Sequence, residues 1–152
     1  MQANKYKLLK NLQQTYCSFG VSKVHGVGVI AIRDIPKGID PFPPVKPEKT
    51  IQLVDKDLEL LPKEVVNKMK DIFVRCNGVY HVYDLGLNCM GIIFHVNHSN
   101  NPNVAVNEGI VTKGYNPFIT LRDIKKGEEL FWNYTICNGD NILNQFKFIK
   151  NE

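Results

Sequence analysis

Three short segments of this chain combine residue types that could bind a small molecule or support catalysis. The first is His25-Gly26-Val27-Gly28. Because glycine has no Cβ, the backbone of such a segment can approach a ligand closely or adopt a positive φ. The segment lacks the third glycine and the following helix of a dinucleotide-binding fingerprint, so that site is not predicted. On these residues alone, a β-bulge or a bend in a hairpin is the simpler interpretation.

The second segment, residues 95–103, is rich in hydrogen-bonding side chains. It reads His-Val-Asn-His-Ser-Asn-Asn-Pro-Asn and follows the apolar residues 90–94. A predicted strand that ends in such a run forms either a loop capped by its own side chains or a polar ligand site.

A metal site is a further hypothesis for this region, because imidazole and thiolate groups are common zinc ligands. Its ligands would be His81, Cys89, His95 and His98. Side chains three residues apart, such as His95 and His98, point to opposite faces of a strand. We therefore expect no metal in this chain.

The third segment, residues 125–134, reads Lys-Lys-Gly-Glu-Glu-Leu-Phe-Trp-Asn-Tyr. The pair Glu128-Glu129 follows a predicted turn and is typical of a surface. Phe131, Trp132 and Tyr134 gather aromatic rings at the end of a short predicted strand. Taken alone, such a cluster is more often part of a core than of a site.

Length and composition indicate one globular domain that could position these segments. The chain has 152 residues, of which 43% are hydrophobic and 22% charged. A chain of this length buries about 68–70% of its unfolded surface and needs no disulfide or structural metal for stability. Its four cysteines are scattered without a CxxC pair, which favours reduced thiols. The net charge of +4 is a weak excess, and no nucleic-acid motif accompanies it.

Membrane insertion and secretion are not expected. No apolar run reaches the roughly 18 residues that a membrane-spanning helix requires. Residues 1–10 lack the continuous hydrophobic stretch of a secretory signal. We therefore expect an intracellular protein.

The hydrophobic pattern predicts many short strands and a few short helices. Helices are expected at residues 4–16 and at 62–74, the second with Pro62 in its first turn and stopped by Asn77-Gly78. The proline-rich residues 41–47 are expected to form an extended loop, because proline donates no ladder hydrogen bond. Strands are expected within residues 19–32, around Tyr80 and Val82, and at 92–96, 104–106, 110–111 and 118–121.

One short stretch occurs twice in the chain. Residues 29–38 and 117–127 both end in Arg-Asp-Ile-x-Lys-Gly. We expect two similar strand–turn units, which are too few for a repeat fold of stacked units.

In their order along the chain, the three segments resemble the SET-domain family of protein lysine methyltransferases. The matching motifs are Gly26-Val27-Gly28, residues 97–103, and Gly127-Glu128-Glu129-Leu130 followed by Tyr134. The resemblance covers about residues 20–135. It implies a mainly β fold with a few short helices: the SET-domain β-clip fold of small curved sheets with a C-terminal pseudoknot. In such a fold Asn97, His98 and Tyr134 would lie side by side.

The resemblance also implies a domain organisation. Residues 1–18 would form an N-terminal helical lead-in. Residues 19–136 would form the SET domain, with an insert at about 41–78. Residues 137–152 would form a C-terminal extension.

The activity implied by the resemblance is S-adenosylmethionine-dependent protein lysine N-methylation. Tyr134 would be the catalytic residue, and Trp132 and Tyr134 would line an aromatic channel in which a deprotonated lysine amine accepts the methyl group in line. The substrate would be a lysine of a protein or peptide, with a histone tail as the expected one, and chromatin as substrate would imply the nucleus. The residues that would bind the cofactor are His25, Gly26, Val27, Gly28, Asn97, His98 and Tyr134.

The chain departs from the family pattern in three places. Cys137 stands alone where the family has a cysteine-rich zinc segment. Residues 142–149 or a second subunit would therefore have to cover the lysine channel, and the second possibility would imply a homodimer. Trp132 replaces the more common Phe or Tyr, which leaves the number of added methyl groups open. The proline-rich residues 41–47 replace a strand. These departures keep an alternative function open: a catalytically silent SET-like module that binds a peptide or the cofactor.

Overall fold

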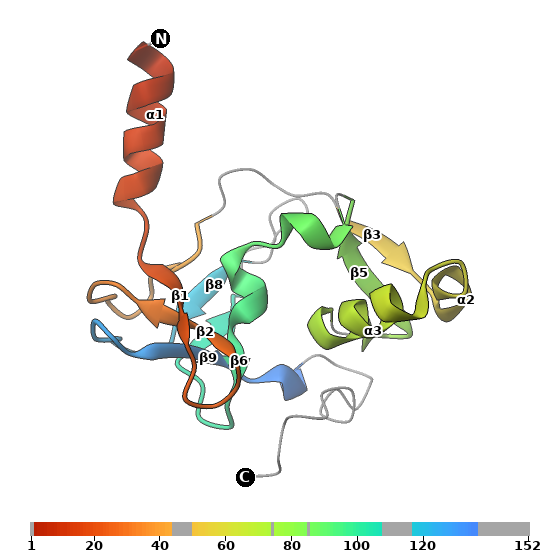
Figure 1. The fold of residues 1–152 in the computed structure, drawn as a ribbon. Helices are drawn as coiled ribbons and strands as arrows, with labels where there is room; N and C mark the ends of the chain where they lie inside the picture. The colour runs from red at the N-terminus through yellow and green to blue at the C-terminus, as the bar shows by residue number, and fades with distance from the viewer. Residues whose placement is uncertain (1, 44–49, 74, 85, 108–116, 137–152) are drawn as a thin grey trace.

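The computed structural model describes residues 2–43, 50–73, 75–84, 86–107 and 117–136. The expected combination of many short strands with a few short helices is confirmed (Figure 1). The helices are α1 (Gln2–Gln13), α2 (Asp55–Leu58) and α3 (Lys63–Ile72), with short 3-10 turns η1 (Gly86–Cys89), η2 (Ile92–His95) and η3 (Tyr134–Ile136). The strands are β1 (Cys17–Val21), β2 (Val27–Ala31), β3 (Thr50–Leu53), β4 (Arg75–Cys76), β5 (Val79–Tyr83), β6 (Asn97–His98), β7 (Val104–Val106), β8 (Phe118–Thr120) and β9 (Glu129–Trp132).

The sheet that matters for the site has the strand order β1-β2-β9-β6. The hairpin β1–β2 and the pair β2–β9 are antiparallel, whereas β6 and β9 are parallel. In the parallel pair, Asn97 lies opposite Phe131 and His98 lies opposite Trp132. Strand β9 therefore lies between an early and a middle segment of the chain, and it brings the second and third motifs together.

Two hydrophobic clusters hold the described elements in place. The first lies under the β1-β2-β9-β6 sheet, and its most completely buried members are Val29, Val104, Ile124 and Leu130, each with 0% of its surface exposed. The second cluster belongs to residues 50–83, called the insert from here on, where Met69 of α3 and Phe73, directly after that helix, pack against strand β5. Figure 1 shows the insert as a separate group of elements, joined to the sheet by the segment that carries η1 and η2.

The two similar stretches of sequence pair with each other. Ile35 and Ile124 form an antiparallel bridge with N···O distances of 2.8 and 2.9 Å. The Asp34 carboxylate accepts a hydrogen bond from the Lys126 amide at 2.9 Å, and Asp123 accepts one from the Lys37 amide at 2.8 Å. Each copy thus caps the turn of the other, which fixes the entry to β9.

The predicted strand at residues 92–96 is wrong, because Ile92–His95 form the 3-10 turn η2. Ile92 and Ile93 pack against the first cluster, while Phe94 packs against the second. A turn can direct consecutive side chains to two different cores, whereas an alternating strand cannot keep Ile92 and Ile93 on one side. The apolar run thereby connects the sheet to the insert.

Both helix predictions were correct in kind but not in their limits. Helix α3 ends at Ile72, and Pro62 precedes it as the N-cap. Asn77-Gly78 does not stop a helix but forms the turn between β4 and β5, with φ of 51° and 80°. Positive φ at both residues is what a tight hairpin requires.

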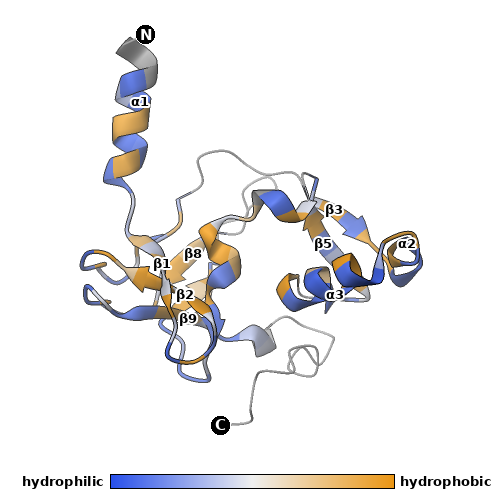
Figure 2. Cartoon of the chain, in the orientation of Figure 1, coloured by the Kyte–Doolittle hydropathy of each residue, from blue (hydrophilic) through white to orange (hydrophobic). Residues whose placement is uncertain are grey.

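Helix α1 extends away from the rest of the chain, and Figure 2 shows hydrophobic and hydrophilic residues alternating along it. Its leucines Leu8, Leu9 and Leu12 are exposed. Strands β3, β4 and β6 and helix α2 were not among the predicted elements. The predicted strand at 110–111, most of the proline-rich loop, Cys137 and residues 142–149 lie outside the described residues.

Candidate functional site

The first motif forms the turn between β1 and β2. The Ser22 amide donates to the Gly26 carbonyl at 3.0 Å, and the Ser22 hydroxyl accepts hydrogen bonds from the amides of Val24 and His25. Gly26 has a φ of +53°, in the left-handed region that favours glycine. This turn directs the backbone of residues 25–27 toward β6.

Gly28 is required for a different reason, which is a close approach between strands. A Cβ placed on Gly28 would lie 2.2 Å from Oε1 of Glu129 and 3.1 Å from Cβ of Ser22. The absence of a side chain therefore leaves room for the Glu129 carboxylate beside β2.

Asn97 joins the first and second motifs. Its side-chain nitrogen donates to the carbonyls of His25 at 3.1 Å and Val27 at 3.2 Å, and to Oε1 of Glu129 at 2.9 Å. Ser22 donates to the other oxygen of the same carboxylate at 3.1 Å. The side chain of Asn97 thus fixes the first turn relative to β6 and β9.

Glu129 corrects the interpretation of the acidic pair as surface. Its carboxylate is half-buried and accepts the hydrogen bonds of Asn97 and Ser22. Glu128 differs, because it pairs with Arg122 at 2.8 Å and accepts from the Lys125 amide. These contacts hold the pKa of Glu128 below its ordinary value, through the Arg122 hydrogen bond first.

Asn103, at the end of the second motif, holds β9 in register. Its side chain donates to the Glu129 carbonyl and accepts from the Phe131 amide, both at 2.8 Å. Only 2% of its surface is exposed. A primary amide satisfies a backbone carbonyl and a backbone amide at once, which explains why an asparagine stands here.

Tyr134 is held against the second motif at two points. Its backbone amide donates to Nδ1 of His98 at 3.1 Å, and its hydroxyl donates to the Val96 carbonyl at 2.5 Å. Burial raises the pKa of the Tyr134 phenol to about 12. The hydroxyl therefore stays protonated near neutral pH and cannot act as a general base there.

Trp132 lies next to Tyr134 in an aromatic cluster. Its ring centroid is 5.3 Å from that of Tyr134 and 5.6 Å from that of Phe118. Its indole Nε1 is buried without a hydrogen-bond partner in the described part of the chain. Trp132 is partly buried against the first cluster.

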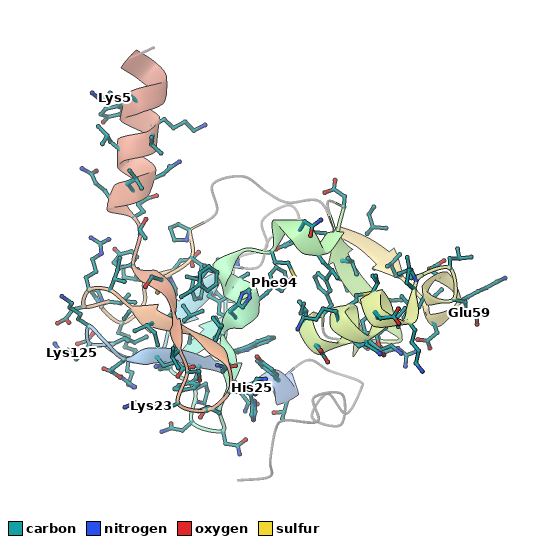
Figure 3. The ribbon with its side chains drawn as sticks, in the orientation of Figure 1. Lys5, Lys23, His25, Glu59, Phe94 and Lys125 are labelled. Carbon is teal, nitrogen blue, oxygen red and sulfur yellow. The ribbon has the colours of Figure 1, made fainter. Side chains whose placement is uncertain are left out.

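A cavity of about 490 Å³ lies between these motifs and the insert. Five of the predicted cofactor residues line it: His25, Gly26, Val27, Asn97 and Tyr134. Gly28 and His98 do not line the cavity: Gly28 leaves room for the Glu129 carboxylate, and His98 accepts a hydrogen bond from the Tyr134 amide. Figure 3 shows His25 on the β1–β2 turn and Phe94 on η2, the segment between the sheet and the insert.

Sequence analysis missed the other wall of the cavity, which consists of Lys68, Asp71, Ile72, Phe94 and His95. His95 belongs to the polar segment 95–103, for which a ligand site was one of two interpretations, but the polar face of the helix predicted at residues 62–74 gives no signal that it borders a cavity. This wall forms only when α3 and η2 pack near the β1–β2 turn in the folded chain, and no local sequence pattern predicts that contact.

The lining suits a polar small molecule. Its volume falls in the range of about 300–1,000 Å³ that is usual for ligand pockets. The polar residues of this lining are His25, His95, Asn97 and Tyr134, together with the charged Lys68 and Asp71. Apolar side chains, an ammonium and a carboxylate complete it.

The described residues contain no group of three His, Cys, Asp or Glu side chains that could hold a metal ion. Of the candidate ligands, His81 is exposed on β5, His95 lies in η2 and His98 in β6. The His98 ring is instead engaged with Tyr134, at 5.3 Å between centroids.

None of the helices in the described ranges has the length and apolar character needed to cross a membrane.

Comparison with known proteins identifies one matching family. The sequence model of the SET domain matches residues 26–135, more than two thirds of the chain. A solved structure from Plasmodium falciparum, described as a "putative histone methyltransferase", is similar at 18% identity and a TM-score of 0.49, over 79% of this chain and 93% of that one. A comparison with curated proteins finds no significant match.

Proposed function

The chain belongs to the SET-domain family, and from this premise we propose that it is an S-adenosylmethionine-dependent protein lysine N-methyltransferase. The observation that supports this most strongly is the cavity shared by the β1–β2 turn, Asn97 and Tyr134. Residues more than 100 positions apart in sequence meet there, with the glycine turn on one side and the half-buried Tyr134 phenol on the other.

The cofactor would occupy this cavity and supply an electrophilic methyl group on a sulfonium. The backbone of residues 25–28 would bind its methionine part, since residues 25–27 line the cavity and Gly26 carries no side chain there. Asn97 would hold the binding backbone in place through its bonds to the carbonyls of His25 and Val27. His98 would position Tyr134 through the Tyr134 amide.

Methyl transfer is an in-line displacement, so the protein contributes mainly alignment of donor and amine at about 3–3.5 Å. The substrate lysine has an unperturbed pKa near 10.4, and its ammonium form has no lone pair for the attack. An aromatic channel lined by Trp132 and Tyr134 would favour the neutral amine by desolvation, with the proton passing to water. The ring faces would also attract a methylated ammonium.

Tyr134 would orient the amine as a hydrogen-bond acceptor. Its hydroxyl proton is directed to the Val96 carbonyl, so the role left to the phenolic oxygen toward a ligand is that of an acceptor. An amine N–H that donates to this oxygen leaves the nitrogen lone pair available for the methyl carbon. The raised pKa of Tyr134 fits this role, because an ionised phenolate would instead hold the amine as an ammonium.

The expected substrate is a histone tail, which would place the protein on chromatin in the nucleus. We test the proposal with isotopically labelled S-adenosylmethionine and core histones. The wild type is expected to transfer label, and Tyr134→Phe is expected to lose about 100-fold in rate. Tyr16→Phe is the matched control, since Tyr16 stacks under Arg33 at 4.0 Å and does not line the cavity.

The bulky Trp132 beside Tyr134 motivates the alternative of a catalytically silent module. Cofactor binding without label transfer to histones, other proteins or lysine peptides would favour that alternative. Equal label transfer by Tyr134→Phe and the wild type would contradict the role assigned to Tyr134.

A further inference from the structure

Helix α3 of the insert presents a charged pair to the cavity. Lys68 and Asp71 both line it, and their Nζ and Oδ2 atoms are 3.9 Å apart. Within the described lining, Lys68 carries the only ammonium and Asp71 the only carboxylate. The opposite wall is the backbone of residues 25–27 with the side chain of Asn97.

The position of this pair is fixed by packing on the other side of the helix. Met69 and Phe73, 2% exposed each, anchor α3 in the cluster of the insert. Ile72 faces the cavity beside the pair, and Phe94 continues that wall while its ring packs on Phe73 at 5.3 Å. The charges are therefore presented by an anchored helix.

We propose that Lys68 and Asp71 bind the α-amino-acid group of S-adenosylmethionine, the Lys68 ammonium to its carboxylate and Asp71 to its α-ammonium. This inference rests on the proposed function. An amino acid carries its two opposite charges on one carbon, so their separation is comparable to the 3.9 Å between the charges of the pair. The cofactor's carboxylate needs a cationic partner, and Lys68 carries the only ammonium of the described lining.

A purely structural role explains this pair less well. The side chains are 66% and 59% exposed, and an exposed helix pair of this kind contributes little to stability. Exchanging that contact for a ligand contact therefore costs little. The pair also lies opposite the backbone that is proposed to bind the methionine part of the cofactor. Both walls would therefore contact the same end of the cofactor.

Binding of two ligands distinguishes recognition of the amino-acid group by Lys68 and Asp71 from a general effect of the substitutions on the cavity. S-adenosylhomocysteine and 5′-methylthioadenosine share the nucleoside and an uncharged thioether, but only the first carries the amino-acid group. Calorimetry with both ligands is applied to the wild type, Lys68→Glu, Asp71→Lys and the double charge-swap variant. Lys70→Glu, exposed on the same helix and outside the cavity lining, is the matched control.

We expect each single variant and the double swap to bind S-adenosylhomocysteine about tenfold more weakly, with methylthioadenosine changed by less than about twofold. The double swap retains an ion pair on the helix but reverses its direction relative to the ligand. Lys70→Glu should match the wild type with both ligands.

Wild-type affinity for S-adenosylhomocysteine in Lys68→Glu, or its recovery in the double swap, would overturn this inference and leave the proposed function intact. Equal weakening of both ligands would also overturn it, because the pair would then act on the nucleoside or on the helix. If the wild type binds neither S-adenosylmethionine nor S-adenosylhomocysteine, the proposed function fails as well.

Discussion

The backbone amide of Tyr134 donates a hydrogen bond to Nδ1 of His98 at 3.1 Å. This bond lies just beyond the parallel pairing of β6 and β9, which ends where His98 lies opposite Trp132. It also requires that Nδ1 of His98 carries no proton. The position of the proposed active-site phenol thus depends on a histidine 36 residues earlier in the chain.

Asn97→Asp should destabilise the fold. The new carboxylate would face the carbonyls of His25 and Val27 and the carboxylate of Glu129, with no donor toward any of them. We expect a loss of about 2–4 kcal/mol in the free energy of unfolding, measured by urea denaturation. Asn101→Asp, on an exposed residue of the same segment, is the control.

A second substitution tests the same contact. Adding Glu129→Gln to Asn97→Asp supplies an amide donor to the new carboxylate, so the double variant should recover part of the lost stability. Strictly additive losses in the two variants would contradict the Asn97–Glu129 contact.

Gly28→Ala should also lower stability, because its Cβ would lie 2.2 Å from Oε1 of Glu129 and force that carboxylate away from Asn97. We expect a loss of about 1–3 kcal/mol, measured by thermal or urea unfolding. Gly91→Ala is a matched control, since nothing lies within 4 Å of its added Cβ and its φ of −71° suits alanine. Equal stability of the two variants would contradict the close approach at Gly28.

Stability should fall at high pH because of Tyr134. Burial raises its pKa in the folded state to about 12, above the value near 10 of an unperturbed phenol. Between these values the unfolded chain loses a proton that the folded state keeps, so the free energy of unfolding decreases as pH rises. Urea unfolding from pH 9 to 11 should show a steeper decline for the wild type than for Tyr134→Phe. Parallel declines would mean that the phenol is not buried.

The pH dependence of methyl transfer should report the substrate amine. Because the lysine must lose its proton, kcat/KM should increase with pH from about 7 to 9. Tyr134 should add no descending limb below about pH 10, since its pKa is raised to about 12. A decline that begins near neutral pH and disappears in Tyr134→Phe would show that the phenol titrates earlier than its burial allows.

The motifs were visible in the sequence because each needs particular residue types at one place. The backbone at Gly26 is left-handed, which favours glycine, and there is no room for a Cβ at Gly28. The position of Asn103 requires a side chain that both donates and accepts a hydrogen bond. The resemblance then supplied the meeting of Asn97, His98 and Tyr134, which no local pattern contains. That meeting depends on a parallel pair between strands about 30 residues apart.

The errors have a common physical origin in tertiary packing. Glu129 has the local pattern of a surface residue, because its partners Ser22 and Asn97 are distant in sequence. The apolar run at 92–96 was predicted as a strand because it serves two separate cores. Lys68 and Asp71 have the composition of any solvated helix face, and only the position of α3 brings them to the cavity.

The central claim is that the cavity bounded by the β1–β2 turn, Asn97 and Tyr134 holds the methyl donor next to the substrate amine. The most direct measurement is a crystal structure with S-adenosylhomocysteine and a lysine-containing histone peptide. We predict the ligand in that cavity, with its thioether sulfur and the lysine nitrogen both within about 4 Å of the Tyr134 hydroxyl. A ligand bound elsewhere, or a lysine that does not reach Tyr134, would contradict the account.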